Sequence, residues 1–276
     1  MRRLNEEIRE VRIPSETLAR WALETPALAK EATYGALAFL VHVEHAAVTL
    51  LPVPTVLAHE AAVLDPDGYL RQPRGAVEHL RLRATRAIAW MDLLIFFRER
   101  FPAAAQRPLP DADSLRGLAR AFSHHDDPLE AAVDLLVHEC VLPELEQLLL
   151  RTVTYPGLQM LLQQVAADDP QRSAEARRLA SYVLGDLSGA RLWRVRKRLV
   201  TTATRAVLGA RPLLDELARG GLKVDRARAA RGFVRRLEEA VADLTGAKVL
   251  PEGLLEKLAE LGAAPAADAR EGQPLP

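Results

Sequence analysis

Apolar residues recur at intervals of three and four along most of the chain, which is the spacing of one face of an α-helix. Thr25-Pro26 and Asp127-Pro128 each place a helix-capping residue directly before a proline at the first helical position. The pattern therefore predicts long helices over residues 26–51 and 128–153.

Two further long helices are predicted over residues 74–101 and, after Asp169-Pro170, to about residue 199. In the helix predicted over residues 74–101, the apolar stripe expected to face the core consists of Val77, Leu80, Ala84, Ile88, Met91 and Ile95. In the second it consists of Ala176, Leu179, Val183 and Leu187. Strand signals are scarce, so the predicted fold class is all-α.

The connections between these helices differ in length, which suggests two helical hairpins. A long connection, 102–127, with a short helix near 115–122, would join them into a four-helix bundle with one crossover. We expect residues 1–200 to form this bundle with an N-terminal helix. Residues 201–262 would then form a C-terminal extension with helices at 201–218, 225–244 and 251–261. The tail, 263–276, is rich in Ala, Pro and Gly and is expected to be disordered.

Two glutamates stand alone among apolar residues on alternate long helices. Glu44 has Leu40, Val41, Ala47 and Val48 as its helical neighbours, and Glu139 has Leu135, Leu136 and Leu142. A carboxylate in such a position faces the core, where it needs a partner, a metal ion or a proton. Histidines accompany both glutamates: His42 and His45 in the first helix, His138 in the other.

The other two long helices carry Glu-x-x-Arg units, Glu78-His79-Leu80-Arg81 and Glu175-Ala176-Arg177-Arg178. With Glu44 and Glu139, they resemble the metal-ligand pattern of the ferritin-like di-iron carboxylate superfamily, over about residues 26–198. That family places one Glu on each of two helices and Glu-x-x-His on each of the other two. The resemblance implies a ferritin-like four-helix bundle and a candidate metal site at Glu44, Glu78, Glu139 and Glu175.

The departure from the family pattern is specific. No Glu-x-x-His occurs in this sequence, and Arg81 and Arg178 stand where the histidines are expected. A guanidinium cannot donate a lone pair to a metal, but it can neutralise buried carboxylates. The leading interpretation is therefore a degenerate, metal-poor site with charge-compensating arginines, in a protein with a binding or assembly role.

An alternative retains the metal. His42, His45, His79 or His138 would supply nitrogen ligands from shifted positions, with Glu44 and Glu139 as anchors for iron or manganese. The chain would then be an active non-haem di-iron oxidase or oxygenase. The sequence identifies neither a substrate nor an electron donor, and it leaves enzymatic activity open.

The composition bears on the cellular compartment of the protein. The chain has 276 residues, of which 49% are hydrophobic, and a single cysteine, Cys140, so it cannot form an intrachain disulfide. We therefore expect a cytoplasmic protein. The excess of arginine over lysine is typical of a bacterium with a GC-rich genome. The longest uncharged apolar stretch, 46–58, is broken by two prolines and is too short to cross a bilayer.

Charge is balanced overall but unevenly distributed. Residues 172–236 hold 17 Lys and Arg against 5 Asp and Glu, a local excess of +12, so the rest of the neutral chain carries −12. The segment 191–199 within it is basic and amphipathic. It is compatible with a nucleic acid or an anionic membrane as partner, and equally with an ordinary solvated face. A homodimer is also compatible with the sequence.

Overall fold

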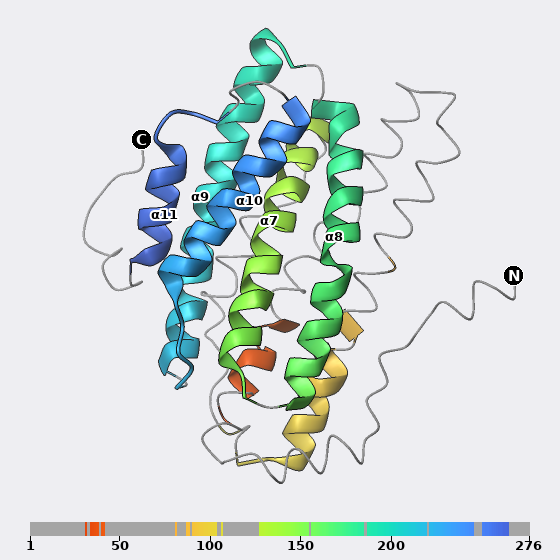
Figure 1. The fold of residues 1–276 in the computed structure, drawn as a ribbon, viewed down its shortest axis with the longest axis vertical. Helices are drawn as coiled ribbons and strands as arrows, with labels where there is room; N and C mark the ends of the chain where they lie inside the picture. The colour runs from red at the N-terminus through yellow and green to blue at the C-terminus, as the bar shows by residue number, and fades with distance from the viewer. Residues whose placement is uncertain are drawn as a thin grey trace, which may run out of the picture.

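The computed structural model describes most of the C-terminal half of the chain, at residues 127–154, 156–184, 187–219, 221–245 and 250–264. In the N-terminal half it describes residues 31, 34–38, 40–41, 81, 87–88, 90–103 and 106. Almost all of these residues are helical and none of them lies in a strand (Figure 1). The predicted all-α class is confirmed for this part of the chain.

Five helices follow one another in the C-terminal half: α7 (Pro128–Thr152), α8 (Pro156–Leu184), α9 (Gly189–Arg219), α10 (Arg226–Thr245) and α11 (Leu254–Ala263). The helices predicted at 128–153, 225–244 and 251–261 are confirmed to within a few residues. The signal that predicted α7 acts as expected, because the Leu129 N–H donates to Asp127 Oδ1 at 2.8 Å and Pro128 needs no hydrogen-bond acceptor there.

Two predicted boundaries are wrong. α8 begins at Pro156, and Pro170 lies inside it. The break expected near residue 200 is also absent, because α9 runs unbroken over 31 residues. The chain turns instead just before Gly189, whose φ of +52° suits glycine. The proposed division at residue 200 therefore falls within a continuous helix.

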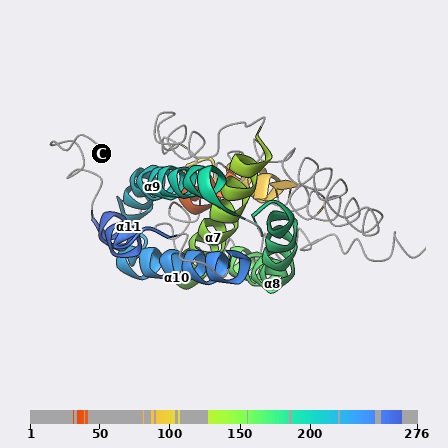
Figure 2. The same ribbon diagram turned by 90° about the horizontal axis from the view of Figure 1, so that it is seen from above.

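α7 lies at the centre of the described structure. It packs against α8, α9 and α10, and every residue from Ala131 to Glu146 is buried. Seen from above, α9 and α10 lie on opposite sides of α7, and α8 lies beside it (Figure 2). A helix buried on all sides must be apolar around its whole circumference or must pair its polar groups. α7 does both.

The short helix α11 covers the side of the molecule between α9 and α10 and packs against both. Its Leu254, Leu258 and Gly262 are buried. One apolar cluster includes Leu258 together with α7 and with Leu37 and Trp90 of the N-terminal half. The helices predicted as a C-terminal extension thus share their core with segments of the predicted bundle.

The predicted core stripe of the 74–101 helix is wrong in its described part. Ile88, Met91 and Ile95 are 53%, 43% and 53% exposed, whereas Trp90, Leu93 and Phe97 are buried. Both faces of this helix are apolar, and the face with the large aromatic rings takes the core because it buries more surface. The helix ends as predicted, since the Phe101 N–H donates to the Phe97 carbonyl at 2.9 Å.

The described residues between 31 and 41 are helical, in agreement with the helix predicted at 26–51. Tyr34, Leu37 and Leu40 are buried in the common core. The remaining parts of that prediction, the short helix near 115–122 and nearly all of the tail after 263 lie outside the described residues.

Candidate functional site

Acidic side chains recur along α7 although the helix is buried. Asp134, Glu139, Glu144 and Glu146 are between 0% and 8% exposed. A buried carboxylate is stable only when another group compensates its charge. For three of these four acids, the arginines that do so come from the helices around α7.

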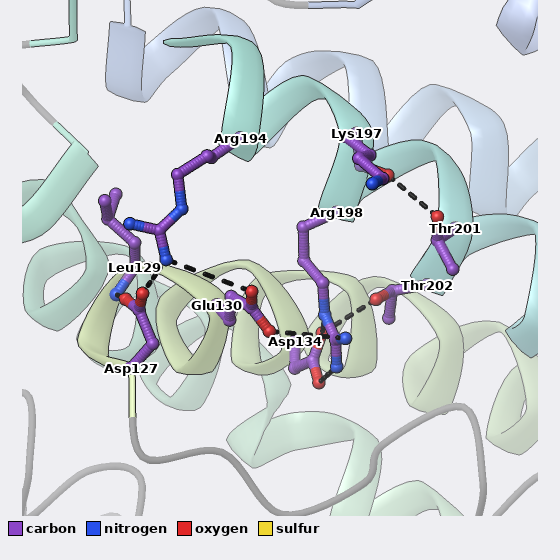
Figure 3. A network of polar contacts seen from close by, with 9 residues as sticks. All are labelled: Asp127, Leu129, Glu130, Asp134, Arg194, Lys197, Arg198, Thr201 and Thr202. Carbon is purple, nitrogen blue, oxygen red and sulfur yellow. Dashed lines mark hydrogen bonds and ion pairs between the residues drawn. The ribbon is translucent and has the colours of Figure 1, made fainter. Parts of the chain in front are cut away.

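The interface of α7 with α9 contains an ordered set of ion pairs, which we call the ion-pair ladder: Asp127, Glu130 and Asp134 against Arg194, Arg198 and Thr202 (Figure 3). The fully buried Asp134 is its centre. Arg198 donates to it through Nε at 2.9 Å and Nη2 at 2.6 Å, in bidentate geometry. Thr202 Oγ1 adds a third donor at 2.7 Å. Both carboxylate oxygens of Asp134 are therefore satisfied.

The outer part of the ladder is more open to solvent. Arg194 pairs with Asp127 and lies 4.0 Å from Glu130 Oε1, while Arg198 Nη1 lies 3.5 Å from Glu130 Oε2. Acids at intervals of three and four on α7 thus meet bases at an interval of four on α9. These pairings require the two helices to run parallel. Asp127 both caps α7 and pairs with α9.

A second polar centre lies on the other side of α7, and we call it the Glu139 pocket. It is a cavity of about 50 Å³ between α7, α8 and α10, lined by Leu136, Glu139, Cys140, Ser173, Arg177, Arg236, Glu239 and Ala240. Glu139 is 4% exposed, so its predicted burial is confirmed. Arg177 of α8 and Arg236 of α10 bring guanidinium groups to the same cavity.

Cys140 is held as a thiol in this pocket. Burial raises its pKa to about 12, the negative charge of Glu139 acts in the same direction, and Arg236 and Arg177 oppose it. A thiol with this pKa is protonated at neutral pH and is therefore a poor nucleophile.

Arg236 connects the Glu139 pocket to a third buried acid. Its Nε lies 2.5 Å from Glu144 Oε1. Gly232, one turn earlier on α10, makes room for this carboxylate, because a Cβ at that position would collide with Glu144 Oε2. A glycine in a helix interior costs stability relative to alanine, and here the close approach of α7 gives it a reason.

The structure describes four of the predicted site residues in full. Besides Glu139, His138 is 2% exposed, with its Nδ1 3.6 Å from Glu139 Oε1. Arg81 and Arg178 are partly buried. The arginine of α8 that lines the Glu139 pocket is Arg177, one residue before the expected Arg178. Glu175 lies in α8, but its side chain is outside the description, as are residues Glu44, Glu78, His42, His45 and His79.

The described groups of the Glu139 pocket do not fit a metal ion. Arg177 and Arg236 cannot act as ligands and would repel a cation. Within the described residues, no group of three or more His, Cys, Asp or Glu side chains is arranged to hold a metal. Chemically, this pocket is a charge-compensated polar cavity.

Sequence reasoning missed the partners of the acids and also Asp134 and Glu144 themselves. One usable signal was present: the acids at 127, 130 and 134 have a spacing that matches the arginines at 194 and 198. The pairs of Arg236 with Glu144 and of Arg177 with the pocket left no such repeated pattern. They depend on how α8 and α10 pack on α7.

No protein-family model, curated protein or solved structure matches this chain. No helix in its described part is both long and apolar enough to cross a membrane.

Proposed function

We propose that this chain is a helical binding or assembly protein of ferritin-like descent, in which arginines replace the metal ions of a buried carboxylate centre. One observation carries the proposal: Glu139 is buried in a small cavity together with Arg177 and Arg236. The descent rests on the spacing of Glu44, Glu78, Glu139 and Glu175 in the sequence.

The charges in the pocket support the metal-free state. The buried Glu139 shares the cavity with two arginines, Arg177 and Arg236. The fixed cations thus supply the positive charge that a metal would otherwise bring. A divalent ion entering the cavity would be repelled by both arginines at short range.

The size of the pocket supports a role in binding or assembly. About 50 Å³ has room for a few water molecules and for no substrate of ordinary size. A buried, charge-compensated centre can fix the relative positions of helices. Recognition of a partner would then fall to the outer surface of the bundle.

Metal analysis of the full chain, purified without chelators, tests the metal-poor state. We expect far less than one iron or manganese ion per chain, and a melting temperature that a chelator does not change. About two ions per chain, as in the di-iron proteins, would overturn the proposal and favour the oxidase alternative.

The descent is tested by restoring the histidines. Arg81→His combined with Arg178→His recreates two Glu-x-x-His units, and we expect this variant to gain iron or manganese binding that stabilises it. Arg81→Gln combined with Arg178→Gln is the matched control, because it removes the same two charges without adding an imidazole ligand. Equal metal binding by the control and the histidine variant, or none by the histidine variant, would contradict the descent.

A further inference from the structure

The structure divides the basic region 172–236 into an inward and an outward part. Arg194 and Arg198 belong to the ion-pair ladder, Arg226 pairs with Asp215, and Arg236 pairs with Glu144. Much of the excess positive charge in the sequence thus compensates acids inside the molecule. An external partner would meet only the basic side chains that remain exposed.

On α9, exposed basic side chains flank a tryptophan, and we call Trp193, Arg196 and Lys197 the Trp193 patch. Trp193 is 61% exposed, more than any other large hydrophobic side chain in the described part of the chain. Lys197 Nζ lies 5.2 Å from the centre of its ring, in a cation–π contact. Arg196 and Lys197 follow Trp193 by three and four residues and therefore lie on the same face of the helix. The patch combines a solvent-exposed aromatic ring with two cationic groups.

Two features make the patch strongly positive and accessible. α9 has seven Arg and Lys and no acidic residue between Gly189 and Leu214. Figure 1 shows the first turns of α9 at one end of the molecule, past the ends of α8 and α10.

We propose that the Trp193 patch docks the protein on the anionic headgroups of a lipid bilayer. Tryptophan prefers the depth of the headgroups, where its ring is half in apolar surroundings and its N–H stays wet. Arginine and lysine on the same helix face attract anionic lipid. Charge complementarity and the exposure of Trp193 both fit an anionic headgroup surface as the partner.

The same features fit a nucleic acid less well. Single-stranded binding sites offer a succession of aromatic rings to successive bases, whereas this patch has one ring, and Lys197 already lies against it. The ion-pair ladder on the inward face of α9 is what holds Trp193 outward. Docking through the patch does not depend on the state of the Glu139 pocket.

Flotation of the full chain with vesicles tests the proposal. We expect binding to vesicles containing about one third phosphatidylglycerol, none to pure phosphatidylcholine, and about tenfold weaker binding when salt is raised severalfold. Tryptophan emission should move to shorter wavelength on binding. That change should disappear in Trp193→Phe, because Trp21 and Trp90 lie elsewhere in the chain.

Charge reversal gives the matched comparison. Arg196→Glu with Lys197→Glu should abolish vesicle binding, whereas Arg228→Glu with Arg231→Glu, an equal change at exposed positions of α10, should leave it within about twofold. Circular dichroism would verify that both variants fold. Equal loss in both variants, no binding by the parent, or binding to DNA but not to vesicles would each overturn the proposal.

Discussion

The two polar centres of α7 compensate the charge of buried carboxylates in different ways. In the ion-pair ladder, Asp134 receives three direct donors from α9. In the Glu139 pocket, acids and arginines line a cavity of about 50 Å³ beside a protonated thiol. Both carboxylate oxygens of Asp134 are satisfied, which suits a role in fixing the register of the two helices. The pocket keeps internal space, and the degenerate site that we propose would lie there.

Breaking the ladder at its centre should have the largest effect. Asp134→Asn removes the charge that Arg198 and Thr202 were arranged around, and it should cost about 3 kcal/mol of unfolding free energy. Breaking a buried ion pair costs about 3–5 kcal/mol. We expect the lower value here because Glu130 remains near Arg198, at 3.5 Å. Urea denaturation of the two proteins measures the difference.

Glu130→Gln is the control for this variant. The Glu130 side chain is 36% exposed, and exposed pairs contribute about 0.5 kcal/mol. If both substitutions cost the same, the burial of Asp134 does not distinguish it from the surface part of the ladder.

The second prediction concerns the close approach beside the pocket. Gly232→Ala would force the Glu144 carboxylate away from its place against α10 and should destabilise the protein by about 2 kcal/mol, as overpacking does. In a Glu144→Ala background the same change should cost much less, because the colliding group is absent. A double-mutant cycle measured by denaturation would show the coupling, and additive effects would contradict the assigned contact.

The starts of α7 and α8 and the burial of Glu139 show what the sequence could and could not predict. The start of α7 was predictable because the Asp127 cap is local, and the burial of Glu139 was predictable from its apolar neighbours. The same Asp-Pro signal at residues 169–170 failed. There α8 continues through Pro170, and packing along α7 outweighs the local signal for a start.

The partners of the buried acids depend on tertiary register. Arg177 and Arg178 are adjacent arginines in the sequence, and only the rotation of α8 on α7 decides that Arg177 lines the pocket. The exposed Ile88 and Met91 make the same point, since an apolar stripe does not reveal which face of a two-sided helix is buried. The sequence therefore predicted the chemistry of α7 better than its contacts.

The third prediction compares the two centres directly. Glu139→Gln should cost about 1 kcal/mol, less than Asp134→Asn, because Arg236, one of the two arginines of the pocket, keeps its ion pair with Glu144. Thermal and urea unfolding measured side by side would give the order. A larger loss at Glu139 than at Asp134 would mean that the pocket, and not the ladder, carries the more tightly coupled pair.

The last prediction has no effect at neutral pH, because it concerns the thiol, which contributes only at high pH. The folded chain raises the pKa of Cys140 from its ordinary 9.0 to about 12. Below pH 9 both the folded and the unfolded chain hold this proton, so the thiol adds no pH dependence there. Between pH 9 and about 12 only the unfolded chain releases the proton, and stability should fall as the pH rises through this window.

Cys140→Ala removes this one titrating group and should flatten the alkaline loss of stability relative to the parent. Glu139→Gln should have a weaker effect in the same direction, because Glu139 is one of the charges that raise the thiol's pKa. Urea midpoints measured at several pH values from 8 upward, as far as the proteins stay folded, would separate the variants. An unchanged slope in Cys140→Ala would show that Cys140 titrates alike in both states. The pocket would then be as open to solvent as the outer ladder, and the contrast between the two centres would no longer hold.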